Sequence, residues 1–191
     1  MIEQEFFSVT HSMTVNIEAL PLDTVLPEQT QFEAEIPAPF IVACEFSHLD
    51  SMGDLAKREL KQHDFPHLLQ LLDAQNSKLN LLLNFLLSQQ DEPEYRHATQ
   101  TFGASQFSFF SPQPWDENTP VRAKLFLDHP AAAIYCYGHT VSCQAHDGQY
   151  VVAVKYDRMR DDDQDLLIKA ALYQQQKLLR QRAADKLNSD K

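Results

Sequence analysis

The sequence predicts an α+β fold, a small antiparallel β-barrel or sandwich with a long helix before it and another helix after it. Three observations support this. Short segments rich in aromatic and β-branched residues, separated by turn residues, fill the stretch from 94 to 157. A leucine-rich stretch with helical spacing, 66–89, precedes them, and a stretch that three aspartates open, 161–182, follows. Short, regular spacing favours antiparallel strands, because parallel strands need long crossovers.

The first 62 residues are expected to hold a strand, a connector and a helix. Apolar and polar residues alternate from Phe7 to Ile17, which predicts a half-buried strand. Four prolines punctuate 21–39, so we expect an extended connector with one short strand around Phe32 to Ile36. The short apolar run 40–46 fits either a strand or the start of a helix. Helical spacing behind Ser47 predicts an amphipathic helix over 47–62.

The stretch Pro66 to Gln89 is predicted to be an oligomerisation helix, since Asp64 and Pro66 form a helix-start signal. Its residues alternate in spacings of three and four, which is the a/d seam of a coiled coil. The seam consists of Phe65, Leu69, Leu72, Asn76, Leu79, Leu83 and Leu86. Asn76 falls at an inner position, where a lone amide fixes register and partner number.

A second apolar row lies on another face of this helix and consists of Leu68, Leu71, Leu82 and Phe85. A helix with two apolar rows needs neighbours on several sides, which favours an assembly larger than a dimer. The alternative is a single core helix buried within a monomer.

Five strands are expected after Pro93, and the Asp147-Gly148 pair between the last two is the strongest hairpin signal. Gly138 is the expected site of a bulge in the long fourth strand. The predicted strands are Glu94–Phe102, Gln106–Phe110, Val121–Leu127, Ala132–Ala145 and Gln149–Asp157.

The last helix is predicted from Asp161, Asp162 and Asp163, because acidic residues at a helix start complement the helix dipole. Its apolar face is interrupted by the glutamines 174–176, so it could contact both the barrel and another subunit. The sequence thus divides into an N-terminal part, an oligomerisation helix, a β-barrel and a C-terminal helix with tail: residues 1–62, 63–90, 91–160 and 161–191.

The composition disfavours some classes of partner and indicates a cellular compartment. With 27 acidic and 16 basic residues, the net charge of -11 disfavours nucleic acid and anionic membrane surfaces. No run approaches about 20 apolar residues and no signal peptide is evident, so we expect a cytoplasmic protein. Three cysteines do not form a disulfide framework.

The residue types of the sequence bear on two kinds of site, a metal site and a catalytic site, and four residues fit the first: they are potential zinc ligands. The four fall within eleven residues: Cys136, His139, Cys143 and His146. If 132–145 is a strand, alternation points Cys136 and His139 to opposite faces, so we expect no structural metal. No catalytic motif is visible, and we expect neither a catalytic residue nor a cofactor.

The order of elements resembles the PilZ domain family, most closely its atypical, tetramer-forming branch. The resemblance rests on three stretches: KLNLLLNFLL (78–87), TFGASQFSF (101–109) and the closing helix from 164 to 182. It implies a PilZ-like barrel and a homotetramer. It also implies a cyclic di-GMP ligand, which the family holds with R-x-x-x-R and D/N-x-S-x-x-G motifs.

Both ligand motifs are degraded in this sequence. Arg96 is the only arginine between Leu87 and Pro120, so it is the one weak candidate for a ligand contact. Thr101, Gly103 and Gln106 replace the Asp or Asn, the Ser and the Gly of the second motif. We therefore expect no tight binding of cyclic di-GMP.

The function expected from these features is a non-enzymatic, oligomeric scaffold or adaptor in cyclic di-GMP-linked signalling, with an unidentified signalling protein as partner. One alternative is a receptor that binds cyclic di-GMP or another nucleotide through altered contacts, with Arg96, Arg122, Arg158 or Arg160. A further alternative is an enzyme whose site has no recognisable motif.

Overall fold

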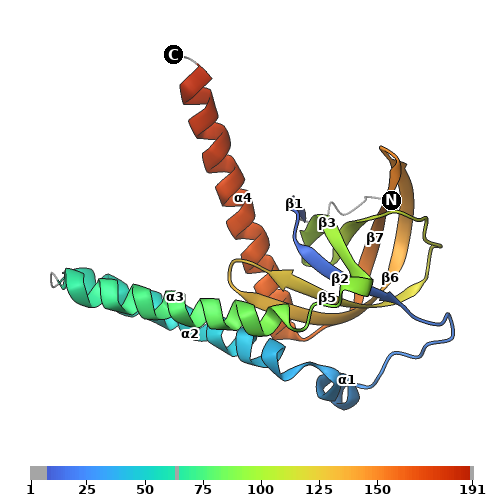
Figure 1. The fold of residues 1–191 in the computed structure, drawn as a ribbon, viewed down its shortest axis with the longest axis horizontal. Coiled ribbons are helices and arrows are strands. Elements are labelled where there is room, and N and C mark those ends of the chain that lie inside the picture. The colour runs from blue at the N-terminus through green and yellow to red at the C-terminus, as the bar shows by residue number, and fades with distance from the viewer. Residues whose placement is uncertain (1–7, 63–64, 190–191) are drawn as a thin grey trace.

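A closed, six-stranded antiparallel β-barrel forms the centre of the computed structural model, which describes residues 8–62 and 65–189 (Figure 1). The prediction of an α+β fold with a small barrel is confirmed. Around the barrel, each strand pairs with the next and the last pairs with the first, in the order β2 (Thr14–Ala19), β3 (Arg96–Gly103), β4 (Gln106–Ser111), β7 (Gln149–Arg158), β6 (Ala132–His146) and β5 (Pro120–Leu127).

The predicted N-terminal strand forms two pieces, β1 (Ser8–Thr10) and β2, which run along the same edge of β3. Phe7 lies outside the described residues. At the break between the pieces, the Thr99 hydroxyl accepts the N–H of Met13 at 3.0 Å and donates to the carbonyl of His11 at 2.7 Å. Since β2 lies between β3 and β5, the barrel includes residues from the first 62 as well as from 91–160.

Alternating side chains fill the barrel, as the period of two in its strands requires. Residues that point inwards include Val15, Ile17, Phe107, Phe109, Val121, Leu125, Val152 and Val154, all buried. The first half of β6 is buried on both faces, because helices cover its outer side. The barrel is a packed core, so any ligand must bind at its surface or its ends.

Two predictions about residues 29–62 were wrong: the short strand around Phe32 and the start of the helix at Ser47. Residues 29–35 form helix α1 (Gln29–Glu35), not a strand, and Phe32 of this helix is buried against the rings of Tyr135 and Tyr137. Helix α2 (Ala38–Gln62) begins nine residues before Ser47, so the run 40–46 is helical and Ser47 is not a cap. The contact of Phe40 with Phe126 explains the early start, because it buries a ring that an extended chain would expose.

Helix α3 (Pro66–Ser88) is confirmed as a continuous helix, and it lies beside α2 as a hairpin that extends away from the barrel (Figure 1). Helix α4 (Asp161–Ser189) begins with the three predicted aspartates. The carboxylate of Asp163 is buried and forms two hydrogen bonds with the Arg160 guanidinium, at 2.7 and 2.9 Å. The second half of α4 also extends away from the barrel (Figure 1).

Two backbone features of the barrel follow the sequence signals. Gly138 lies at a register shift between β6 and β7, and a Cβ there would be 2.4 Å from the Lys155 carbonyl oxygen, so only glycine fits. Asp147 and Gly148 both have positive φ, 46° and 82°, as the two-residue hairpin requires. The five predicted strands are therefore present, with ends that differ by one or two residues.

Candidate functional site

Helix α3 carries a broad apolar surface that the rest of the described chain leaves largely exposed. We call this surface the α3 face. Its residues are between 38% and 63% exposed and fall in two groups along the helix, one in each half. The α3 face consists of Leu68, Leu71, Leu72, Leu79, Leu82, Phe85 and Leu86. Solvent-exposed leucines in such a row mark an interaction surface, since isolated soluble domains seldom expose contiguous apolar patches of this kind.

The residues of the predicted seam fall into two sets, one buried or half-buried within the chain and one exposed. Leu69, Asn76 and Leu83 are seven residues apart, so they share one side of α3, and they are half-buried or buried within the chain. Asn76 lines a small groove together with Phe46 and Leu49 of α2. This half of the seam therefore faces the rest of the chain, and Leu83 belongs to the hydrophobic core. The other half, Leu72, Leu79 and Leu86, remains exposed at the edge of the α3 face.

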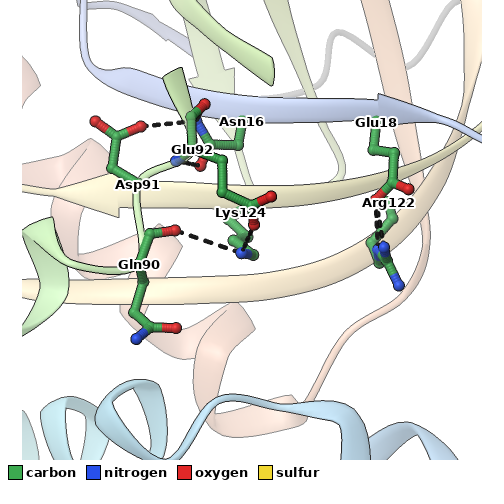
Figure 2. A network of polar contacts seen from close by, with 7 residues as sticks. All are labelled: Asn16, Glu18, Gln90, Asp91, Glu92, Arg122 and Lys124. Atoms are coloured by element: carbon green, nitrogen blue, oxygen red, sulfur yellow. Dashed lines mark hydrogen bonds and ion pairs between the residues drawn. The ribbon is translucent and has the colours of Figure 1, made fainter. Parts of the chain in front are cut away.

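The junction between α3 and the barrel is fixed by Asn16, whose side chain is 3% exposed (Figure 2). Its amide donates to Asp91 Oδ1 at 2.8 Å and to the Glu92 carbonyl oxygen at 3.2 Å. Its own oxygen accepts the N–H of Glu92 at 2.9 Å. The amide therefore uses its donor and acceptor groups on the segment that follows α3, and it ties that segment to β2.

The cations near this junction are paired with carboxylates of the same chain. Arg96, the candidate ligand contact, forms an ion pair with Asp91 at 2.8 Å. Lys124 contacts the carboxylate of Glu92 and donates to the Gln90 carbonyl oxygen, as Figure 2 shows. A phosphate ligand would have to compete with Asp91 for this guanidinium nitrogen, although about half of the Arg96 side chain is exposed. The ion pair joins the start of β3 to the segment after α3.

Arg122 contacts the carboxylate of Glu18 through two nitrogen atoms in the same view (Figure 2). The pair joins β2 to β5, two strands that already share a ladder. Both side chains are partly exposed, so the pair contributes little to stability, but it removes Arg122 from the set of free cations.

The second degraded motif lies inside the sheet. Thr101 pairs with β1 on one side and with β4 on the other, and its hydroxyl contacts the Ser108 hydroxyl at 2.8 Å. Gly103 ends β3 and Gln106 begins β4. The polar atoms of Thr101 are thus engaged in the barrel's own contacts.

The four potential zinc ligands are separated along β6. Cys136 is buried in the core, where desolvation raises the pKa of its thiol well above the ordinary value. His139 contacts Asp157 at 2.8 Å, and Cys143 accepts the N–H of Trp115 at 3.4 Å. Across residues 8–62 and 65–189, no three His, Cys, Asp or Glu side chains are grouped as metal ligands would be.

We expect purified protein to contain far less than one zinc per chain, because the described ligands are not grouped and burial raises the pKa of Cys136, which must be a thiolate to bind zinc. Elemental analysis by mass spectrometry after dialysis measures this. A stoichiometric zinc that disappears in Cys143→Ala would contradict the prediction, and Cys44→Ala, a cysteine outside the set, is the matched control.

Comparison with solved structures identifies the fold family of the barrel and its helices. A protein from Xanthomonas campestris, described as a tetrameric PilZ domain self-assembled through an unusual helical bundle, superposes with a TM-score of 0.56. The alignment covers 92% of this chain and 91% of that one, at 14% identity. The chain has the PilZ fold. The predicted resemblance in fold is therefore confirmed, including the helix before the PilZ barrel and the helix after it.

The other comparisons cover less of the chain or find no match. An inhibitor of motility from Bacillus subtilis aligns over 43% of this chain and 42% of its own, with 11% identity and a TM-score of 0.41. No family model and no curated protein matches the sequence. None of the helices in the described part of the chain is long and apolar enough to span a membrane.

Sequence reasoning missed Asn16, the residue that joins α3 to the PilZ barrel. The alternation of the N-terminal strand places Asn16 on the polar face, which predicted exposure to water. In the structure the outer side of β2 is covered by the segment 91–92, so this polar side chain is buried and hydrogen-bonded. No local pattern marks it, because its partners lie about 75 residues away.

Proposed function

We propose that this chain is a non-enzymatic scaffold or adaptor that assembles through its α2–α3 hairpin and acts in cyclic di-GMP-linked signalling in the cytoplasm. The observation that carries the proposal is the α3 face. Its seven apolar side chains are exposed in the single chain, although they lie on a helix long enough to form a bundle.

The proposed assembly is a homotetramer. The Xanthomonas campestris protein is described as a tetramer formed by a helical bundle, and its fold covers this hairpin as well as the barrel. The contacts between subunits are assigned to Leu72, Leu79 and Leu86 together with the second row around Leu82 and Phe85. Leu69, Asn76 and Leu83 face the rest of the chain, where they are half-buried or buried.

The assembled barrels would present their surfaces to a signalling protein. The junction supports a role that does not depend on nucleotide. Asp91 forms an ion pair with Arg96, and Asn16 holds the segment between α3 and the barrel. In this proposal the chain's own contacts hold the segment between α3 and the barrel without a ligand.

We expect cyclic di-GMP to show no saturable binding below about 100 µM and to leave the mass of the assembly unchanged. Titration calorimetry and light scattering, each with and without the nucleotide, measure the two effects. Arg96→Ala serves as the matched variant. If the wild type binds with saturation and Arg96→Ala does not, the protein is a receptor and the nucleotide-independent scaffold is wrong.

A further inference from the structure

One end of the barrel holds a cavity of about 560 Å³ that the proposed assembly does not use. Its lining includes residues of three strands and of the loop after β4: Ile17, His97, Ser111 and Trp115. Its rim comes from the segment 94–95, the end of β2 and the loop between β4 and β5. This volume lies within the range of small-molecule sites.

Trp115 is held rigidly at this end of the barrel. Its indole N–H donates to the Ser111 hydroxyl at 3.0 Å, and its backbone N–H donates to the sulfur of Cys143 at 3.4 Å. Its ring meets Phe109 edge to face, with centroids 5.5 Å apart. These contacts hold Trp115 beside the cavity that it lines, and Tyr95 is a second aromatic residue of the lining.

The charged residues that line the cavity are all acidic. Glu18, Glu94 and Asp116 line it, and none of its lining residues is a lysine or an arginine. Glu18 is paired with Arg122, but Glu94 and Asp116 have no ion pair within the described part of the chain. These carboxylates raise the pKa of the Tyr95 hydroxyl, chiefly through Glu94 and then through Glu18.

His97 contributes an acceptor. Its Nδ1 lies 3.0 Å from the carbonyl oxygen of Phe110, and a carbonyl can only accept, so Nδ1 carries the hydrogen. Burial lowers the pKa of the His97 imidazole, which keeps the ring neutral and leaves Nε2 with a free lone pair. The cavity thus combines two aromatic rings, two unpaired carboxylates and one neutral acceptor.

We propose that this cavity binds a small organic cation, a ligand with an ammonium or guanidinium group on an apolar body. Aromatic faces attract such cations, and the attraction grows where carboxylates add to it and no basic side chain opposes it. An anion would meet only repulsion at this rim. The site is independent of the α3 face, because it lies at the barrel end formed by β2, β3 and β4.

The cation could arrive as a free small molecule or as a side chain of a protein partner, and the chemistry of recognition is the same. Trp115 is the only tryptophan in the chain, so its fluorescence reports the cavity directly. The probes are arginine methyl ester and an acetylated, amidated Gly-Gly-Arg-Gly-Gly peptide. Sodium chloride at equal ionic strength is the reference for non-specific effects.

We expect arginine methyl ester to change Trp115 fluorescence with saturation at a Kd of about 1 mM or below. Glu94→Gln should weaken binding by about three- to tenfold, because it removes one unpaired charge at the rim. Glu117→Gln is the matched control, since Glu117 lies on the same loop as Asp116 but outside the cavity lining, and its Kd should stay unchanged.

The peptide separates the two sources of the cation. Binding of the peptide with similar affinity assigns the site to a partner's arginine, and binding of the ester alone assigns it to a free small molecule. A fluorescence change no larger than the sodium chloride reference, or equal weakening by Glu94→Gln and Glu117→Gln, would overturn the proposal.

Discussion

Replacing Leu82 by aspartate is expected to convert the assembly into monomers. Leu82 is 62% exposed in the single chain and lies in the middle of the α3 face, so the change scarcely affects the fold of one subunit. In the assembly, the new carboxylate would be buried without a partner, which costs several kcal/mol per subunit. We expect the dissociation constant to rise by at least about 100-fold, as measured by size exclusion with light scattering.

Leu82 is a sharper target than Leu79, because Leu79 also lines the groove between α3 and α2. Leu22→Asp is the matched control. Leu22 is 78% exposed but lies on the connector before α1, far in sequence from the hairpin, and its replacement should leave the mass unchanged. An unchanged mass for Leu82→Asp, or equal effects of the two variants, would show that subunits associate elsewhere.

Replacing Asn16 by alanine is expected to lower the free energy of unfolding by about 2–4 kcal/mol. The change removes the three hydrogen bonds that tie the segment 91–92 to β2, and it leaves the Glu92 amide without its acceptor. Urea unfolding followed by circular dichroism measures the loss. The segment joins α3 to β3, so hydrogen exchange of its amides should accelerate as well.

Asn84→Ala provides the control for Asn16, since Asn84 is exposed on α3 and alanine favours a helix. Its stability should stay the same or rise slightly. A loss of less than about 0.5 kcal/mol for Asn16→Ala would mean that the junction holds without its buried amide, and that the orientation of the hairpin has another cause.

The strands and the long helix could be predicted because their signals are local. Alternating side chains and the Asp147-Gly148 turn determine β6 and β7 directly, and Pro66 marks the start of α3. Helix α1 could not be predicted from its seven residues. It forms where Phe32 finds the rings of Tyr135 and Tyr137, about 100 residues away.

The α3 face was predicted in part from the sequence. A periodic row of leucines shows that a helix needs apolar neighbours, but it does not show whether they belong to the same chain or to another subunit. The structure leaves Leu69, Asn76 and Leu83 half-buried or buried within the chain, whereas Leu72, Leu79 and Leu86 are between 38% and 49% exposed. Periodicity alone could not separate these two sets.

The cavity at the barrel end had no sequence signal. Its residues come from three separate stretches, 17–19, 94–97 and 111–119, and only closure of the barrel brings them together. Trp115 and Glu94 belong to no motif; Trp115 lies in a loop and Glu94 in a short 3-10 helix, Pro93–Tyr95. A site of this kind becomes visible only in three dimensions.

The central claim is that the α3 face is covered by other copies of this chain. Sedimentation equilibrium of the wild-type protein between about 1 and 100 µM tests it most directly, because the measured mass does not depend on the shape of the projecting helices. The account predicts a mass of four times 21.9 kDa at the upper concentrations. A mass of 21.9 kDa throughout would contradict it.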